Sequence, residues 1–160
     1  EVDEHEFYAR IAEVRRAASD RAVLRAAHVF SENRRCAEET AALGNGDFER
    51  FLRLVSESGR SSWMYLQNVI PTGSTARQEL AFALLLCERL LGGRGAFRVH
   101  GGGFAGTVQA FVPEDMLAGF RAGIDSVLGA GSCHVLSIRR EGGCLRERLS
   151  DVEHAPAVDV

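Results

Sequence analysis

A glycine-rich stretch in the second half of the chain has the residue types best suited to approach a ligand. Two short apolar runs, 96–100 and 107–112, flank a loop that contains four glycines. Glycine adopts a positive φ without steric cost and lets a ligand or another backbone come close. The bare N–H groups of such a loop can bind an anion. The residues expected at this site are His100, Gly101, Gly102, Gly103, Phe104, Ala105 and Gly106.

The loop fits neither of two familiar glycine motifs. His100 followed by three glycines could form the oxyanion loop of an esterase, but the sequence contains no Gly-x-Ser-x-Gly motif to supply a nucleophile. The spacing also matches Gly-x-Gly-x-x-Gly, but a dinucleotide fingerprint opens a helix, and this loop leads into the alternating pattern of a strand. From the residues alone, a glycine-rich hairpin without a ligand remains the alternative.

Composition excludes several other kinds of chemistry. The 160 residues suit a single soluble domain, and the net charge of −3 gives no electrostatic reason to expect nucleic acid or a membrane as partner. All nineteen of the Lys and Arg residues are arginines, so no lysine is present to bind a phosphate or form a Schiff base. The five histidines lack the spacing of metal ligands, so we expect no metal site in this chain.

The four cysteines are widely spaced and form no Cys-x-x-Cys pair. A disulfide framework is therefore not expected, and a reducing cytoplasmic location fits better. Cys36 and Cys87 fall within helical patterns, which predicts core thiols. No apolar run is long enough to span a bilayer, and the start of the chain does not resemble a signal peptide. Because the chain opens on Glu1 without methionine, we expect it to be part of a longer polypeptide, and a processed N-terminus is the alternative.

Two helices must precede the loop at the start of the chain. Apolar residues at steps of three and four predict a helix over 4–18, within an initial segment 1–19. Asp20 is the expected N-cap of a longer helix that continues through Leu43. Glycine and asparagine at 44–46 then predict a helix stop and a turn.

Two further helices are expected between that turn and the loop. Asp47 is the expected cap of the first. Its end, 56–62, is rich in serine and contains a glycine, which favours either a small-residue packing face or a polar end turned towards a site. Thr75, with glutamine three residues later, matches a capping box for a helix over 76–91. That helix is apolar nearly all round, which predicts burial.

The remainder of the chain completes an α+β fold. The two apolar runs beside the loop read as strands, a helix is expected from Pro113, and a third strand over 133–138. This order favours a ferredoxin-like antiparallel sheet packed against helices on one face, with additional N-terminal helices. That fold needs a fourth strand, expected near 139–149, whereas 139–160 as a whole is expected to be a partly loose tail.

Three segments together resemble one enzyme family. Residues 98–107, Arg-Val-His-Gly-Gly-Gly-Phe-Ala-Gly-Thr, resemble the third signature motif of the GHMP kinases, most closely that of galactokinases, Arg-x-Thr-Gly-[Gly/Ala]-Gly-Phe-Gly-Gly-Cys. Residues 25–33 resemble the galactokinase segment Arg-Ala-x-His-Val-x-x-Glu. Residues 46–58 resemble its Gly-Asp-x-x-x-Phe-Gly-x-Leu-Met-x-Glu-Ser. The likeness extends over about 20–140, most of the chain.

The resemblance implies that residues 1–160 are the C-terminal domain of a two-domain sugar kinase. Such an enzyme transfers the γ-phosphoryl group of ATP, with Mg²⁺, to the anomeric hydroxyl of galactose or a related sugar. The phosphate loop and the catalytic aspartate belong to the N-terminal domain, the implied partner, which is absent from this chain. No catalytic residue is therefore expected here, and the fragment alone is expected to be inactive and to bind no cofactor. Glu57, Ser58 and Ser61 are candidates for a supporting layer behind the glycine loop.

The loop departs from the family pattern at three positions. His100 stands where threonine is usual, Ala105 where glycine is usual, and Thr107 where cysteine is usual. These departures bear on the identity of the sugar and on activity itself. Two alternatives follow: a non-catalytic sugar- or nucleotide-sensing module derived from a GHMP kinase, and a free-standing ferredoxin-like interaction domain without a ligand.

Overall fold

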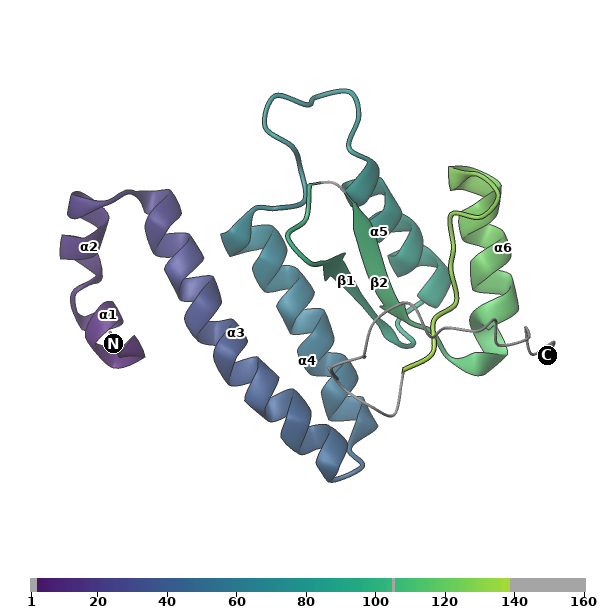
Figure 1. The fold of residues 1–160 in the computed structure, drawn as a ribbon, viewed down its shortest axis with the longest axis horizontal. Helices are drawn as coiled ribbons and strands as arrows, with labels where there is room; N and C mark the ends of the chain where they lie inside the picture. Colours follow the sequence, from purple (N-terminus) through teal and green to yellow (C-terminus); the bar gives the residue numbers. More distant parts are fainter. Residues whose placement is uncertain (1–2, 105, 139–160) are drawn as a thin grey trace, which may run out of the picture.

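The computed structural model describes residues 3–104 and 106–138, which form an α+β arrangement, as the sequence predicted (Figure 1). The strands are β1 (Ala96–His100) and β2 (Thr107–Phe111). The helices are α1 (Glu4–Ala9), α2 (Ile11–Ala17), α3 (Asp20–Gly44), α4 (Phe48–Ser61), α5 (Glu79–Leu91) and α6 (Leu117–Leu128), with a π-helical turn η1 (Ser62–Leu66) and a 3₁₀ turn η2 (Glu114–Met116).

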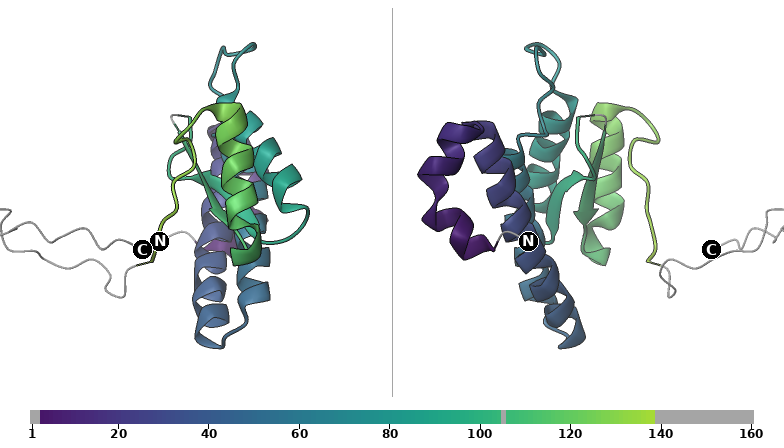
Figure 2. Two further views of the ribbon diagram at one scale, coloured as in Figure 1. Left: turned by 90° about the vertical axis from the view of Figure 1, so that its right-hand side faces the viewer. Right: turned by 60° about the vertical axis from the view of Figure 1, so that its left-hand side comes forward.

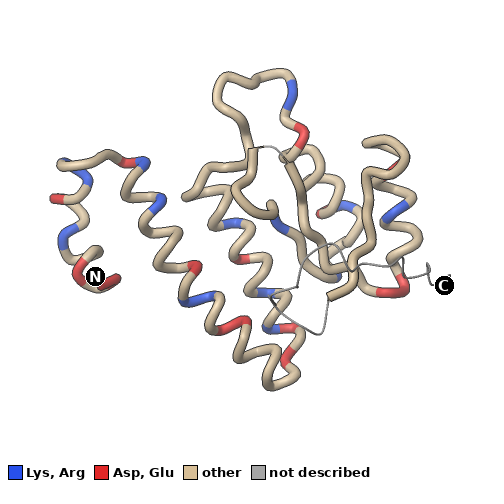
Figure 3. The backbone as a smooth tube through the Cα atoms, in the orientation of Figure 1, with Lys and Arg blue, Asp and Glu red and all other residues tan. Residues whose placement is uncertain are grey.

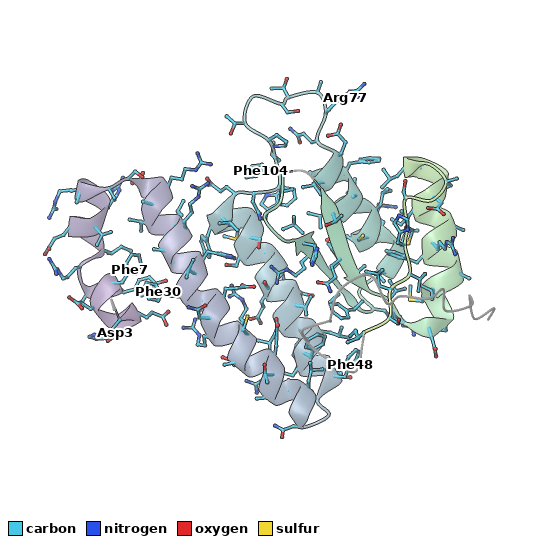
Figure 4. All side chains as sticks on the ribbon, viewed as in Figure 1. Asp3, Phe7, Phe30, Phe48, Arg77 and Phe104 are labelled. Atoms are coloured by element: carbon cyan, nitrogen blue, oxygen red, sulfur yellow. The ribbon has the colours of Figure 1, made fainter. Side chains whose placement is uncertain are left out.

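The first two helices form an N-terminal arm, defined here as α1 and α2, that folds back beside α3 (Figure 2). A single helix over 4–18 was predicted, and this is wrong, because the backbone leaves the helical region at Arg10, with φ −111° and ψ 18°. The break lets Phe7 meet Phe30 of α3, with ring centroids 5.2 Å apart (Figure 4). Arg34 also donates to the Glu4 carboxylate at 2.8 Å.

Each helix of the α3–α4 pair begins at a residue whose side chain caps it. The N-cap of α3 is Ser19, whose hydroxyl accepts from Ala22 N at 3.1 Å, and not Asp20 as predicted. Asp20 instead lies inside the helix, where its carboxylate pairs with Arg15. Asp47 caps α4, as predicted, and accepts from Arg50 N at 2.9 Å.

The segment between α4 and α5 departs most from expectation. The Thr75 capping box and a helix start at 76 are wrong, because α5 begins at Glu79 after an uncapped Gln78. The hydroxyl of Ser74 donates to the carbonyl of Arg77 and stabilises a non-helical turn there. Asn68 and Val69 are buried at the start of this segment, and the part that follows them projects from the body of the molecule, with Arg77 near its tip (Figure 4).

The two strands form an antiparallel hairpin whose faces both contact helices. In the register, Ala96 lies opposite Phe111, and His100 lies opposite Thr107. Ala96 packs with Phe51 and other residues of the α3–α4 pair. Side chains on the alternate positions, which point to the opposite face, pack against α5 and α6. The expectation that helices cover one face alone is therefore wrong.

The predicted third strand over 133–138 is also wrong. The segment has no strand conformation, and Leu136 and Ile138 are 87% and 92% exposed. Its start is tied to α6, because Cys133 N donates to the Asp125 carboxylate at 2.9 Å. Within the described residues, the sheet consequently has only β1 and β2. The fourth strand expected near 139–149 and the tail over 139–160 lie outside the described residues.

Two expectations about burial need correction. Cys36 is exposed, not a core thiol, because it lies on the side of α3 that faces away from α4. Cys87 is buried, as predicted, and its burial raises the pKa of its thiol to about 11. The helix α5 is not buried all round: Phe82 and Leu85 are exposed, because only one side of the helix packs against the hairpin and α6.

Charged residues of both signs lie interspersed over the helices (Figure 3). By contrast, the stretch from Val99 to Pro113, which contains the glycine loop and β2, has no charged residue. Among the described residues, no helix has both the length and the apolar character needed to cross a membrane.

Candidate functional site

The glycine loop joins β1 to β2 and turns by means of three residues with positive φ. Gly101 has φ 64°, Gly103 has φ 75°, and Phe104, which is not a glycine, has φ 55°. At the base of the loop, the hydroxyl of Thr107 lies 3.4 Å from Nδ1 of His100. Ala105 lies outside the described residues. A non-glycine residue in the left-handed region is under strain, and such residues cluster at functional sites.

The loop is anchored to the segment that follows η1. The N–H of Phe104 donates to the carbonyl of Asn68 at 2.9 Å. A Cβ atom on Gly103 would lie 2.8 Å from both Cβ and Cγ of Asn68, so only glycine fits there. Gln67, next to Asn68, is the second non-glycine residue with a positive φ, at 55°. The two left-handed residues, Gln67 and Phe104, therefore occur on the two segments that meet at this contact.

The outer side of the loop is open. A Cβ atom on Gly101, Gly102 or Gly106 would meet no other atom within 4 Å, and Phe104 is 42% exposed at the end of the hairpin (Figure 4). Since no charged side chain lies on this stretch of the chain, an anion brought to the loop would meet the dipoles of backbone N–H groups. The arrangement can accept the close approach of a phosphate or of another backbone.

A partly buried polar cluster lies where α3, α4 and β1 meet. Glu32 of α3 accepts a hydrogen bond from the hydroxyl of Ser58 of α4. It also accepts from Arg98 of β1 at 3.0 Å and from Arg35 at 2.6 Å. Arg98 in turn donates from Nε to the carbonyl of Val99 at 3.2 Å, so the cluster reaches the strand that leads into the loop. A second bond from Nδ1 of His28 to the hydroxyl of Ser61, at 2.9 Å, joins α3 to α4.

The electrostatics of this cluster favour a charged Glu32 and a neutral His28. Burial alone would raise the pKa of Glu32, but the hydrogen bonds from Ser58 and Arg35 and the positive charges of Arg98 and Arg35 lower it overall. Burial lowers the pKa of His28, and the charges of Arg35 and Arg98 act in the same direction against the opposing effect of Glu32. At neutral pH, the cluster therefore contains a carboxylate held by two arginines beside a neutral imidazole.

The residues predicted as a supporting layer fall into two groups. Ser58 and Ser61 are buried and bond to Glu32 and His28 respectively, so they support the site through the helix pair. Glu57 is exposed on the other side of α4. Of the two descriptions left open for the end of α4, the small-residue packing face fits best, because a Cβ atom on Gly59 would lie 3.1 Å from Cβ of Arg98.

Sequence reasoning missed Asn68 and Gln67. They lie in a segment without periodicity, and neither residue belongs to a recognisable motif. The only sequence signal near them was the break at Pro71, which predicted irregular structure without assigning it a role. Their importance follows from contacts between segments far apart in the chain, which no local pattern encodes.

A cavity of about 1150 Å³ opens beside the loop, between β2 and the α5–α6 pair. Polar residues line it only in part, and most of its wall is apolar, which suits neither a sugar nor a phosphate. The residues at its loop end are His100, Phe104, Gly106 and Thr107, and those deeper in its wall include Leu80, Cys87, Phe120 and Ile124. The open glycine face is thus better suited to a polar ligand than this cavity is.

The part of the chain that the structure describes contains no group of three or more His, Cys, Asp or Glu side chains placed to hold a metal ion. No protein-family model matches the chain.

Proposed function

We propose that this chain is the C-terminal domain of a galactokinase-like sugar kinase and that it supplies the glycine loop to an active site shared with an N-terminal domain. The observation that carries the proposal is the meeting of the three segments that resemble galactokinase motifs. Glu32 comes from the first segment, Ser58 from the second and Arg98 from the third, and the side chains of Ser58 and Arg98 both donate to the Glu32 carboxylate. The motif positions thus make one physical unit.

The proposed reaction moves the γ-phosphoryl group of ATP to the anomeric oxygen of galactose, and the proton of that hydroxyl passes to a base in the N-terminal domain. Phosphoryl transfer depends mainly on positioning and on stabilising the charge of the transferred group. In this proposal, the open backbone at Gly101, Gly102 and Gly106 approaches the phosphates, and Mg²⁺ and ATP are bound by the N-terminal domain. The chain alone is then inactive.

The proposal also covers fold and location. It assigns the fold of the GHMP kinase C-terminal domain to the chain, of which the β1–β2 hairpin and its flanking helices are the described part. It places the protein in the cytoplasm, where ATP and free sugars occur together. Two of the three departures from the family motif lie next to each other in the structure. His100 and Thr107 are opposite each other in the strand register, and the Thr107 hydroxyl lies 3.4 Å from Nδ1 of His100.

The test is ATP-dependent phosphorylation of galactose by the full-length protein that contains this chain. We compare the wild type with Gly106→Ala, whose new methyl group meets no atom of this chain within 4 Å and requires no positive φ. The stability of this variant should therefore stay within about 0.5 kcal/mol of the wild type. Its kcat should fall at least tenfold, because the methyl group occupies space that the phosphates need.

The matched control is Gly119→Ala in α6, which also adds a methyl group in open space, away from the loop. It should leave kcat unchanged and should not lower stability. If Gly106→Ala turns over as fast as the control, the loop does not approach the phosphates. A wild type that phosphorylates no hexose, in a reading frame without a phosphate loop or an aspartate base, would overturn the kinase assignment.

The sensing module is the second candidate, and the absence of galactokinase-like threonine and cysteine at 100 and 107 favours it. Isothermal titration of the full-length protein with galactose and with ATP separates the two. Saturable binding without product formation supports a sensor, and product formation supports the kinase.

A further inference from the structure

We propose that Asn68 is a positioning residue for the glycine loop: its side-chain amide bonds to peptide groups of the loop when the loop closes on a bound phosphate. This inference rests on the proposed function, since it assigns the loop a phosphate-bound state. Asn68 belongs to none of the motif segments. What singles it out is its place in the structure.

The amide of Asn68 is buried without a partner. The residue is 2% exposed, and neither Oδ1 nor Nδ2 has a hydrogen-bond partner among the described residues. A buried polar group without a partner destabilises the fold, whereas an apolar side chain of the same shape would not. The unpartnered amide of Asn68 lies beside the loop that ligands are proposed to approach. We therefore infer that the amide gains hydrogen-bond partners when the loop closes.

The peptide groups of the glycine loop are the nearest candidates for hydrogen bonds to the Asn68 amide. Cγ of Asn68, the amide carbon, lies directly against the α-carbon of Gly103, close enough that a Cβ atom there would be 2.8 Å away. The carbonyl of Asn68 already accepts from Phe104 N at 2.9 Å. A small rotation of the peptides on either side of Gly103 would bring an N–H or a carbonyl within reach of the amide. Glycine permits that rotation at low cost.

Backbone strain occurs on both segments that meet at this contact. Gln67 and Phe104 each hold φ at 55°, a conformation that is unfavourable for residues with a Cβ atom. The segment before Gln67 is η1, a single π-helical turn, and such turns occur frequently at functional sites. Closure of the loop would relieve strain at Phe104 and give the amide its bonds in the same movement.

The chemistry of the closed state follows from this contact. The amide offers one acceptor and two donor hydrogens, so it can hold a peptide N–H and a peptide carbonyl at once. It would thereby fix the loop N–H groups in the orientation that meets a phosphate oxygen. Asn68 does not touch the substrate itself, so its effect should appear in turnover and not in sugar affinity.

The experiment uses Asn68→Leu in the full-length protein, because leucine has a similar shape and no polar atom. The matched control is Asn45→Leu, the same chemical change at an exposed position in the turn between α3 and α4, outside the motif segments. We expect Asn68→Leu to raise the melting temperature, since it removes an unpartnered buried amide, and to lower kcat at least tenfold with KM for galactose changed less than twofold. Asn45→Leu should leave kcat unchanged. Asn68→Ala provides the same kinetic comparison if leucine prevents folding.

A second measurement does not depend on turnover. Amide hydrogen exchange of the peptide that spans 101–106 is followed with and without ATP, Mg²⁺ and galactose. We expect the wild type to gain protection when the ligands are added, and Asn68→Leu to gain at least fivefold less. A purely structural residue would change the melting temperature but not this difference.

The outcomes separate the two proposals. If the wild type turns over and Asn68→Leu matches it in kcat and in ligand-induced protection, the role of Asn68 is wrong and the kinase assignment stands. If the wild type gains protection without product, the catalytic assignment is wrong, and the protection of Asn68→Leu decides the role of Asn68. If the wild type shows neither product nor protection, both proposals are wrong.

Discussion

His28 shows how a single buried residue links the fold to pH. It is 7% exposed, it bonds through Nδ1 to Ser61, and its pKa is lowered by burial and by two nearby arginines. The folded chain therefore resists protonating His28, whereas the unfolded chain takes up the proton near the ordinary histidine pKa of about 6.5. The contribution of the neutral imidazole to the free energy of unfolding is fully present above that pH, and it decreases as the pH falls below it.

We predict that the unfolding free energy of the chain falls between pH 7.5 and 5.5 and that His28→Gln flattens this dependence. The slope due to one proton is at most about 1.4 kcal/mol per pH unit. Glu32 stays ionised over this range, because its lowered pKa lies below the ordinary value of 4.5. Urea denaturation at three pH values, with both proteins, measures the difference. Parallel curves for the two would show that His28 is not the titrating group.

Some of the residues at the site could be predicted from the sequence and others could not. The glycine loop was predicted from its residue types and neighbours, and the structure shows why glycine is needed at position 103, which is the close approach of Asn68. Asn68 itself could not be predicted, because its contact joins segments separated by an entire helix and strand. The burial of Ser58 and Ser61 was predicted only as one of two alternatives, since a serine-rich helix end does not show whether its side chains pack against another element or face a site.

At the scale of elements, one polar cluster joins α3, α4 and β1. Its central ion pairs are partly buried: the side chains of Glu32 and Arg98 are 20% and 24% exposed. Removing one partner of such a pair leaves the other charges without compensation in a poorly solvated place. The position of β1, and with it the start of the glycine loop, therefore depends on Glu32.

We predict that Glu32→Gln lowers the unfolding free energy by about 2–3 kcal/mol, because charge-assisted bonds to two arginines are lost. The matched control is Glu49→Gln in α4, whose pair with Arg53 is highly exposed, at 91% and 63%. That change should stay within about 0.5 kcal/mol. Both values come from urea titrations at pH 7. Equal effects of the two substitutions would mean that the cluster adds nothing beyond a surface ion pair.

The elements themselves were predicted where local chemistry determines them. The strand over 96–100, the Asp47 cap and the helix stop after Leu91 depend on alternation, capping and glycine, and all three are present. Local chemistry was insufficient elsewhere. The predicted capping box at Thr75 does not form, because the hydroxyl of Ser74 bonds to the carbonyl of Arg77 in a turn. The alternating residues over 133–138 do not form a strand, because a strand requires a hydrogen-bonded neighbour.

At the scale of the whole molecule, the N-terminal arm is peripheral to the site. Its contacts with the rest of the chain centre on Phe7 against Phe30 and on Glu4 with Arg34. The three buried apolar clusters that surround the hairpin contain no residue of the arm. Ser19, the cap of α3, belongs to the body of the molecule and not to the arm.

We predict that deleting residues 1–18 leaves a chain that still unfolds in one cooperative transition. The loss of stability should be about 1–3 kcal/mol, the value expected when one buried aromatic contact is removed. Hydrogen exchange of the Phe104 amide, which bonds to Asn68, should not change. Circular dichroism during urea denaturation and exchange mass spectrometry provide the two measurements. A gradual transition, or faster exchange at Phe104, would show that the arm supports the hairpin.

The turn η1 has a consequence for spectroscopy. Trp63 lies within this turn, is 43% exposed, and is the only tryptophan in the sequence. Tryptophan emission from this chain therefore originates at one place, in the turn that leads directly into Gln67 and Asn68. Any movement that changes the exposure of the indole of Trp63 to water alters the wavelength and intensity of that emission. The segment that anchors the glycine loop thus contains its own fluorophore, and its movements can be followed optically without a label.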